Sequence, residues 1–174
     1  MNHEAYSDSY IREILSRYRT IAMVGASANT SRPSYFAMKY LKQKGFRVIP
    51  VNPGQAGKEI LGERVYASLA DIPEKVDIVD IFRSSDAALG ITKQAIELGA
   101  KVVWMQLGVR NDEAARLAEQ AGLQVVMNRC PKIEYGRLSG ELGWAGVYSR
   151  RLSSKRPILG PKGVQHRVLK RAGD

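Results

Sequence analysis

Residues 20–35 read TIAMVGASANTSRPSY, and this stretch decides the fold of the chain. Its apolar run, residues 21–24, is typical of a buried strand in a parallel sheet. Gly25 follows, where the backbone can turn sharply without a Cβ penalty. A loop of small residues comes next, and Pro33 stands where the first position of a helix is expected. A strand, a glycine-containing loop and a helix N-terminus in this order bind phosphate through free backbone N–H groups and the helix dipole.

The same alternation of apolar strands and amphipathic helices continues along the chain. Further strands are predicted at residues 46–51, 76–82, 101–107 and 123–127. Helices are predicted at residues 3–18, 33–44, 84–98 and 111–121, with a short one at 69–72, irregular chain around it from 59 to 73, and a last helix or turn from Pro131. This order predicts an α/β fold, a doubly wound parallel five-stranded sheet of the Rossmann-like type with an N-terminal helix. In such folds the ligand lies at the carboxyl ends of the strands.

Length, charge and cysteine content limit the class of protein. A chain of 174 residues forms one domain with a full core. Residues 139–174 hold eight of the 27 Lys and Arg residues but two of the 17 acidic ones. We therefore predict a folded domain at 1–138 and a basic C-terminal tail at 139–174. One cysteine, no apolar run of about 20 residues and no signal-peptide pattern at the N-terminus favour a cytoplasmic protein without a membrane segment.

The loop lacks the fingerprints of two common nucleotide sites. Only Gly25 stands where a dinucleotide site has three glycines, and Asn52 and Pro53 stand where an acidic residue would bind the ribose. The lysine-containing loop that binds nucleoside triphosphates is also absent. Arg32, at the end of the loop, favours a nucleotide with additional phosphates.

Six short segments, taken together, resemble a known family. The chain is similar to the small bacterial and archaeal CoA-binding proteins over about residues 11–138, and to the N-terminal CoA-binding half of the α subunit of succinyl-CoA synthetase. The segments are GAS at 25–27, RPSY at 32–35, VIPVNP at 48–53, VDIVDIFR at 76–83, WMQLG at 104–108 and NRCP at 128–131.

The resemblance implies where coenzyme A, or an acyl-CoA, would bind. The loop from Gly25 and the start of the following helix would hold the pyrophosphate, the end of the second strand would border the adenosine, and the ends of the last two strands would border the pantetheine arm. The residues expected at the site are Gly25, Ala26, Ser27, Arg32, Pro33, Ser34, Tyr35, Asn52, Pro53, Phe82, Arg83, Gln106, Leu107, Gly108, Asn128 and Cys130.

The chain departs from the synthetase at two points. Gln55 stands where the synthetase domain has a lysine near the adenosine, so Arg32 or Arg83 would have to supply that charge. The synthetase's phosphorylated histidine belongs to a second domain that has no counterpart here, and His3 and His166 are terminal. We therefore expect no catalytic residues and no metal site in this chain alone.

Several of these residues also have a structural interpretation. Tyr35 would pack beneath the loop, Gln106 would satisfy backbone groups, and Asp77 and Asp80 would be structural acids rather than catalytic ones. Cys130 lies between Arg129 and Lys132, where positive charge would lower the pKa of its thiol. We hypothesise that this thiol lies near the CoA thiol and forms a mixed disulfide with it.

Three functions are compatible with the sequence. The first is a CoA- or acyl-CoA-binding protein, and the second is an enzyme component that uses CoA or a nucleotide with a partner subunit. The third is a nucleic-acid-associated protein that uses the basic tail, although this tail lacks the interleaved aromatic residues typical of such segments. Pairing into a homo-oligomer also remains open.

Overall fold

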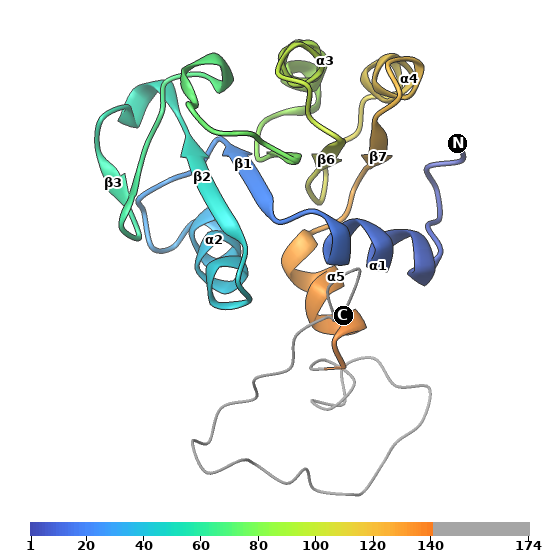
Figure 1. Cartoon of the computed structure of the whole chain (residues 1–174), viewed down its shortest axis with the longest axis horizontal. Coiled ribbons are helices and arrows are strands. Elements are labelled where there is room, and N and C mark those ends of the chain that lie inside the picture. Colours follow the sequence, from blue (N-terminus) through green and yellow to red (C-terminus); the bar gives the residue numbers. More distant parts are fainter. Residues whose placement is uncertain (141–174) are drawn as a thin grey trace, which may run out of the picture.

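A parallel sheet of five strands forms the centre of the protein in a computed structural model, which describes residues 1–140 (Figure 1). The strands lie in the order β2-β1-β5-β6-β7 and all neighbours are parallel. The predicted α/β doubly wound sheet is confirmed. The strands are β1 (Thr20–Val24), β2 (Arg47–Val51), β5 (Ile78–Ile81), β6 (Val102–Met105) and β7 (Gln124–Val126).

Helices cover both faces of this sheet (Figure 1). One face packs against α1 (Asp8–Arg17), α2 (Pro33–Gln43) and α5 (Pro131–Leu138). The other packs against α3 (Ser85–Glu97), α4 (Asp112–Gln120) and the short 3-10 helix η2 (Leu69–Asp71). Side chains along each strand alternate between the two cores, as a pleated strand requires. The continuous apolar runs in the sequence reflect this burial on both faces.

The direction in which successive strands are added to the sheet reverses at β1. From β1 the chain crosses through α2 to β2 on one side, and then passes back to β5 on the other side. Val24, the last residue of β1, is level with Val51 on one neighbour and Ile81 on the other. The chains that leave β1 and β5 therefore diverge at the same edge of the sheet, where doubly wound folds bind ligands.

The N-terminal helix begins later than predicted. α1 starts at Asp8, because Ser7 caps it by accepting a hydrogen bond from the Tyr10 N–H. Residues before Ser7 run beside β7 instead, and the Tyr6 hydroxyl accepts a hydrogen bond from the Met127 N–H at 2.8 Å. The predicted helix at 3–18 is therefore wrong at its start, although its face of Ile14 and Leu15 is buried as expected.

Other boundaries also differ from the prediction. The strands predicted at 46–51, 76–82, 101–107 and 123–127 are each shorter, because their end residues leave the sheet ladder to form turns. The segment predicted to be irregular contains a small hairpin of β3 (Glu59–Ile60) and β4 (Glu63–Arg64). Pro33 occupies the first turn of α2 and Asn111 caps α4, as predicted. In the described part of the chain, no helix has the length and apolar character that crossing a membrane would require.

Candidate cofactor-binding groove

Gly25 sets the path of the loop that follows β1. Its φ of +92° lies in the left-handed region, and its N–H donates to the Val51 oxygen at 2.8 Å. A Cβ atom placed here would lie 2.4 Å from the Phe82 carbonyl oxygen and 2.9 Å from the Arg83 side chain. Glycine is therefore required both by the backbone angle and by the close approach of the chain leaving β5.

Two amides from the end of β2 hold this loop in place. The Asn52 Nδ2 donates to the Ala26 oxygen at 2.8 Å, while its Oδ1 accepts from the Gly54 N–H at 3.0 Å. The Gln55 Oε1 accepts from the Ala28 N–H at 3.0 Å. Gln55, which marked a departure from the synthetase pattern, thus fastens the loop. The Asn52 side chain does the same, so its polar atoms are used within the protein.

The loop leaves backbone donors available. Within residues 1–140, the N–H groups of Ala26, Ser27 and Ser34 donate to no protein acceptor. Ser34 is in the first turn of α2, where N–H groups have no intrahelical partner. Free donors at a helix N-terminus, together with the helix dipole, stabilise an anion.

Two of these residues, Ser27 and Ser34, line a polar cavity of about 380 Å³, here called the loop hollow. The guanidinium groups of Arg32 and Arg83 bring two positive charges to it, and no carboxylate lines it. Its lining residues are Gly25, Ser27, Arg32, Pro33, Ser34, Asn52, Phe82 and Arg83. The chemistry of this lining suits a phosphorylated group.

A second cavity, of about 270 Å³, adjoins the loop hollow on the side of β2. This β2-side hollow shares Gly25, Asn52 and Arg83 with the loop hollow. Its full lining is Val24, Gly25, Val51, Asn52, Pro53, Ala67, Ser68, Leu69, Arg83, Ala87, Ile91 and Gln94.

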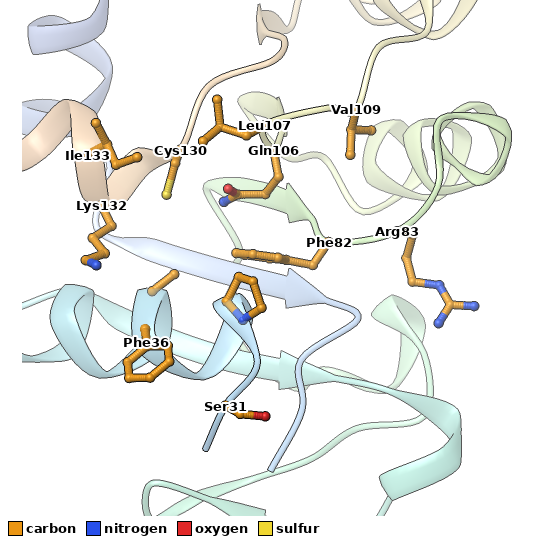
Figure 2. A pocket seen from close by; sticks show the side chains of 12 residues that line it. Ser31, Phe36, Phe82, Arg83, Gln106, Leu107, Val109, Cys130, Lys132 and Ile133 are labelled. Atoms are coloured by element: carbon orange, nitrogen blue, oxygen red, sulfur yellow. The ribbon is translucent and has the colours of Figure 1, made fainter. Parts of the chain in front are cut away.

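A third and larger cavity, of about 590 Å³, adjoins the loop hollow on the other side (Figure 2). This α5-side hollow shares Pro33, Phe82 and Arg83 with the loop hollow. Most of its lining is apolar, and it consists of Ser31, Pro33, Phe36, Ala37, Phe82, Arg83, Gln106, Leu107, Val109, Cys130, Lys132 and Ile133. The three hollows form one groove across the carboxyl ends of the strands.

A buried carboxyl group lies beneath the α5-side hollow. Asp80 on β5 is fully buried, and the Gln106 Nε2 lies 2.8 Å and 3.0 Å from its two oxygens. Burial raises the pKa of Asp80 to about 8, and the hydrogen bond from Gln106 partly offsets this effect. Gln106 therefore serves a carboxyl group rather than the backbone groups expected from the sequence. The structural interpretation of Asp77 agrees with its bonds, because its Oδ2 accepts from the Arg19 and Thr20 N–H groups.

The expectation that Cys130 has a lowered pKa is wrong. Its side chain points into the α5-side hollow (Figure 2), but burial raises the pKa of the thiol. Backbone hydrogen bonds from Ile133 and Lys132 act in the opposite direction and are outweighed. The positive neighbours in the sequence were misleading, because desolvation of the thiolate is the larger effect. The mixed disulfide with CoA therefore loses the chemical argument on which it rested.

The structure brings together twelve of the sixteen residues that the sequence analysis selected, and leaves four outside the hollows. Ala26 is buried, and Tyr35 packs against the core. Asn128, with a φ of +53°, uses its Oδ1 to accept the Gly108 N–H at 2.8 Å, so these two residues join the segment after β6 to the segment after β7. That these sixteen residues contact a ligand stays a prediction.

The sequence analysis missed half of the α5-side hollow. Phe36 and Ala37 follow Pro33 at helical spacing, so they lie on the same side of α2, and Lys132 and Ile133 occupy the first turn of α5. Helical spacing was the available signal for Phe36. Ser31, Val109, Lys132 and Ile133 gave no comparable signal, because only the fold brings their segments together.

The one histidine in the described residues lies away from the groove. The His3 Nδ1 is 2.9 Å from the Tyr6 hydroxyl, and its Nε2 is 3.4 Å from a Glu119 oxygen. No cluster of three metal-ligating side chains occurs within residues 1–140.

Comparison with known proteins finds one matching family and two proteins that are similar over most of this chain. The family model described as CoA binding domain matches residues 19–136. The uncharacterized protein YneT of Bacillus subtilis is 36% identical over 129 residues, which are 74% of this chain and 94% of YneT. The solved structure of a hypothetical protein from Pyrococcus horikoshii is 46% identical with a TM-score of 0.74, over 77% of this chain and 93% of that chain.

A larger enzyme subunit matches over a shorter region. The α subunit of acetate–CoA ligase (ADP-forming) I of Pyrococcus furiosus is 32% identical over 95 residues. These residues are 52% of this chain and 21% of that subunit. The similarity therefore concerns one part of the ligase subunit.

Proposed function

The chain belongs to the CoA-binding domain family, and from this premise we propose that it binds coenzyme A in the groove formed by the three hollows. The observation that carries the proposal is the order of these hollows. A polar, positively charged cavity with free N–H donors lies between two less polar ones. Coenzyme A has the same order, with phosphates between an adenine and a pantetheine arm.

The lining of each hollow supports an orientation for the ligand. The pyrophosphate would accept hydrogen bonds from the Ser27 and Ser34 N–H groups, with Arg32 and Arg83 beside it. The adenosine would occupy the β2-side hollow, against Pro53. The pantetheine arm would run over Phe82 into the α5-side hollow.

A second candidate is a role as one component of a CoA-dependent enzyme. The match to part of an ADP-forming acetate–CoA ligase subunit favours it. His3 lies outside the groove, and the other histidine, His166, is outside the described residues. A partner would then supply the reactive groups, and turnover would appear only when that partner is added.

Calorimetric titration with CoA and NAD tests the leading proposal. We expect CoA to bind and NAD to bind much more weakly. Arg32→Glu places a negative charge at the loop hollow, and we expect it to weaken CoA binding at least about tenfold, since hydrogen bonds to charged groups contribute about 1.5–3 kcal/mol. Arg32 is exposed and makes no side-chain cap to α2, so this change leaves the fold intact.

Lys39→Glu is the matched control. Lys39 is an exposed residue of α2, the helix that Arg32 precedes, and it lines none of the three hollows. Both substitutions replace a positive charge by a negative one, so the two variants have the same net charge. We expect CoA affinity within about twofold of wild type, because salt screens an exposed charge at this distance. Absence of CoA binding, or an equal loss in both variants, would contradict the proposal.

A further inference from the structure

The exposed apolar side chains of the protein gather at one place. Of the large apolar residues that are exposed within residues 1–140, Phe36, Leu107 and Ile133 all line the α5-side hollow, and Met1 is the remaining one. Their exposed fractions are 50%, 56% and 43%. They come from α2, the end of β6 and α5, and they lie around the same opening in Figure 2. Exposed apolar surface concentrated in this way marks a binding site.

The hollow that these side chains surround is continuous with the loop hollow. Pro33, Phe82 and Arg83 line both cavities. A ligand anchored by phosphate at the loop therefore has its other end in the apolar cavity. This continuity favours a small amphipathic ligand over a separate protein partner as the occupant.

Gln106 provides a polar contact on the way into the apolar region. Its Nε2 is held by the buried Asp80 carboxyl group, and within the described residues its Oε1 has no hydrogen-bond partner. The residue is only 5% exposed, and its amide end points into the hollow toward Cys130 (Figure 2). The Oε1 is not one of the buried atoms that lack a partner, so it is accessible from the hollow and can accept a hydrogen bond from a ligand N–H. The amide N–H groups of a pantetheine arm are donors of this kind.

We propose that the ligand is an acyl-CoA with an apolar acyl group, which packs between Phe36, Leu107 and Ile133 beyond the Gln106 amide. This inference rests on the proposed binding of CoA in the groove and adds the chemical class of the group attached to its sulfur. The α5-side hollow, of about 590 Å³, is the largest of the three, and its mostly apolar lining suits an apolar group beyond the pantetheine arm.

A chain-length series measured by calorimetry tests the inference. The ligands are CoA, acetyl-CoA, butyryl-CoA and hexanoyl-CoA, with the full-length wild-type protein. We expect affinity to rise about threefold to fourfold for each added methylene group that is buried. Succinyl-CoA has the four-carbon length of butyryl-CoA but ends in a carboxylate, and we expect it to bind more weakly because that charge loses its hydration in an apolar cavity.

Leu107→Ser tests the location of the acyl group. Leu107 is exposed, so the change does not disturb the core. We expect the gain in affinity per methylene group to fall by at least half, measured for each protein relative to its own affinity for free CoA, because Leu107 also lines the path of the pantetheine arm. Leu61→Ser, in the turn between β3 and β4 and outside the three hollows, is the control and should retain the full gain; because Leu61 is half-buried against the core, urea unfolding must first show that this variant is folded.

The outcomes separate the two proposals. Binding of CoA with no dependence on acyl length, or tighter binding of succinyl-CoA than of butyryl-CoA, would overturn the inference and leave CoA binding intact. Dimerisation that Leu107→Ser abolishes, without dependence on acyl length, would identify the apolar rim as a contact between copies and would also overturn it. Failure of every CoA compound to bind would overturn the proposed function itself.

Discussion

Gly25 shows how one residue controls the geometry of the groove. Its positive φ turns the chain away from β1, and the missing side chain lets the Phe82 carbonyl group approach. Because Gly25 and Phe82 directly follow the neighbouring strands β1 and β5, their contact sets the spacing of the loop hollow.

Replacing Gly25 by alanine should destabilise the protein. We expect Gly25→Ala to lower the free energy of unfolding by about 2–4 kcal/mol, because backbone strain adds to the 2.4 Å contact with the Phe82 oxygen. Gly57→Ala separates the two effects, since Gly57 has a φ of +81° but no atom within 4 Å of a Cβ position. We expect it to lose about 1 kcal/mol. Urea unfolding measures both, and equal losses would show that the close contact has no role.

The buried acid Asp80 should make stability depend on pH. Its pKa is raised from 3.8 to about 8 on folding, so the folded protein holds this proton more tightly than the unfolded chain. Between these values, Asp80 therefore lowers the free energy of unfolding as pH rises, by up to about 1.4 kcal/mol per pH unit. Its stabilising contribution is complete below the unfolded pKa and is lost above the folded pKa.

Asp80→Asn tests this dependence. Asparagine keeps an acceptor for the Gln106 Nε2 but does not ionise. We expect its free energy of unfolding to vary less between pH 5 and pH 8 than that of wild type, and to exceed the wild-type value at pH 8. Urea unfolding at each pH gives the comparison, and parallel pH profiles would show that Asp80 does not titrate in this range.

At the scale of whole elements, the two edge strands of the sheet are protected in different ways. The β2 edge contains Pro50, which has no N–H, and the Tyr66 backbone bonds to the Pro50 oxygen and the Asn52 N–H. On the β7 edge, the Tyr10 hydroxyl bonds to both the N–H and the oxygen of Val125, and the Tyr6 hydroxyl accepts from the Met127 N–H. Unpaired groups on an exposed strand edge would otherwise favour association with another chain.

Removal of the Tyr10 hydroxyl should uncover part of the β7 edge. We expect Tyr10→Phe to lower the free energy of unfolding by about 1–3 kcal/mol, because two backbone groups lose their partner. We also expect greater self-association in sedimentation velocity. Tyr18→Phe is the control, since the Tyr18 hydroxyl makes no hydrogen bond within residues 1–140. If both variants behave alike, the Tyr10 hydroxyl does not protect the edge.

At the scale of the whole molecule, the groove depends on the reversal of strand order at β1. β1, β5, β6 and the segment after β7 each deliver residues to it, and the helices α2 and α5 close the side that holds the α5-side hollow. These residues come from segments more than 100 positions apart, such as Gly25 and Ile133. The predicted basic tail at 139–174, with its proposed contact to nucleic acid, lies almost wholly outside the described residues and stays a prediction.

The predictable parts of the site were those with a local cause. The loop at Gly25 and the proline at the start of α2 were recognisable because backbone angle and helix position follow from residue type. The later start of α1 was not, because Tyr6 bonds to Met127, just after β7 and 121 residues away in the chain, in preference to continuing the helix. For Cys130, neighbouring charges in the sequence suggested a reactive thiol, whereas burial decides its pKa.

By itself, the sequence determined the alternation of strands and helices, the doubly wound class and the turn at Gly25 that opens the first loop. These properties follow from hydrophobic periodicity and from the backbone preferences of glycine and proline, which act over a few residues. The tertiary structure alone decided that Asp80 is held by Gln106, that Asn52 and Gln55 fasten the loop, and that three exposed apolar side chains surround one cavity. The physical reason is that burial and hydrogen-bond pairing depend on which strands become neighbours, and strand order is a property of the whole chain.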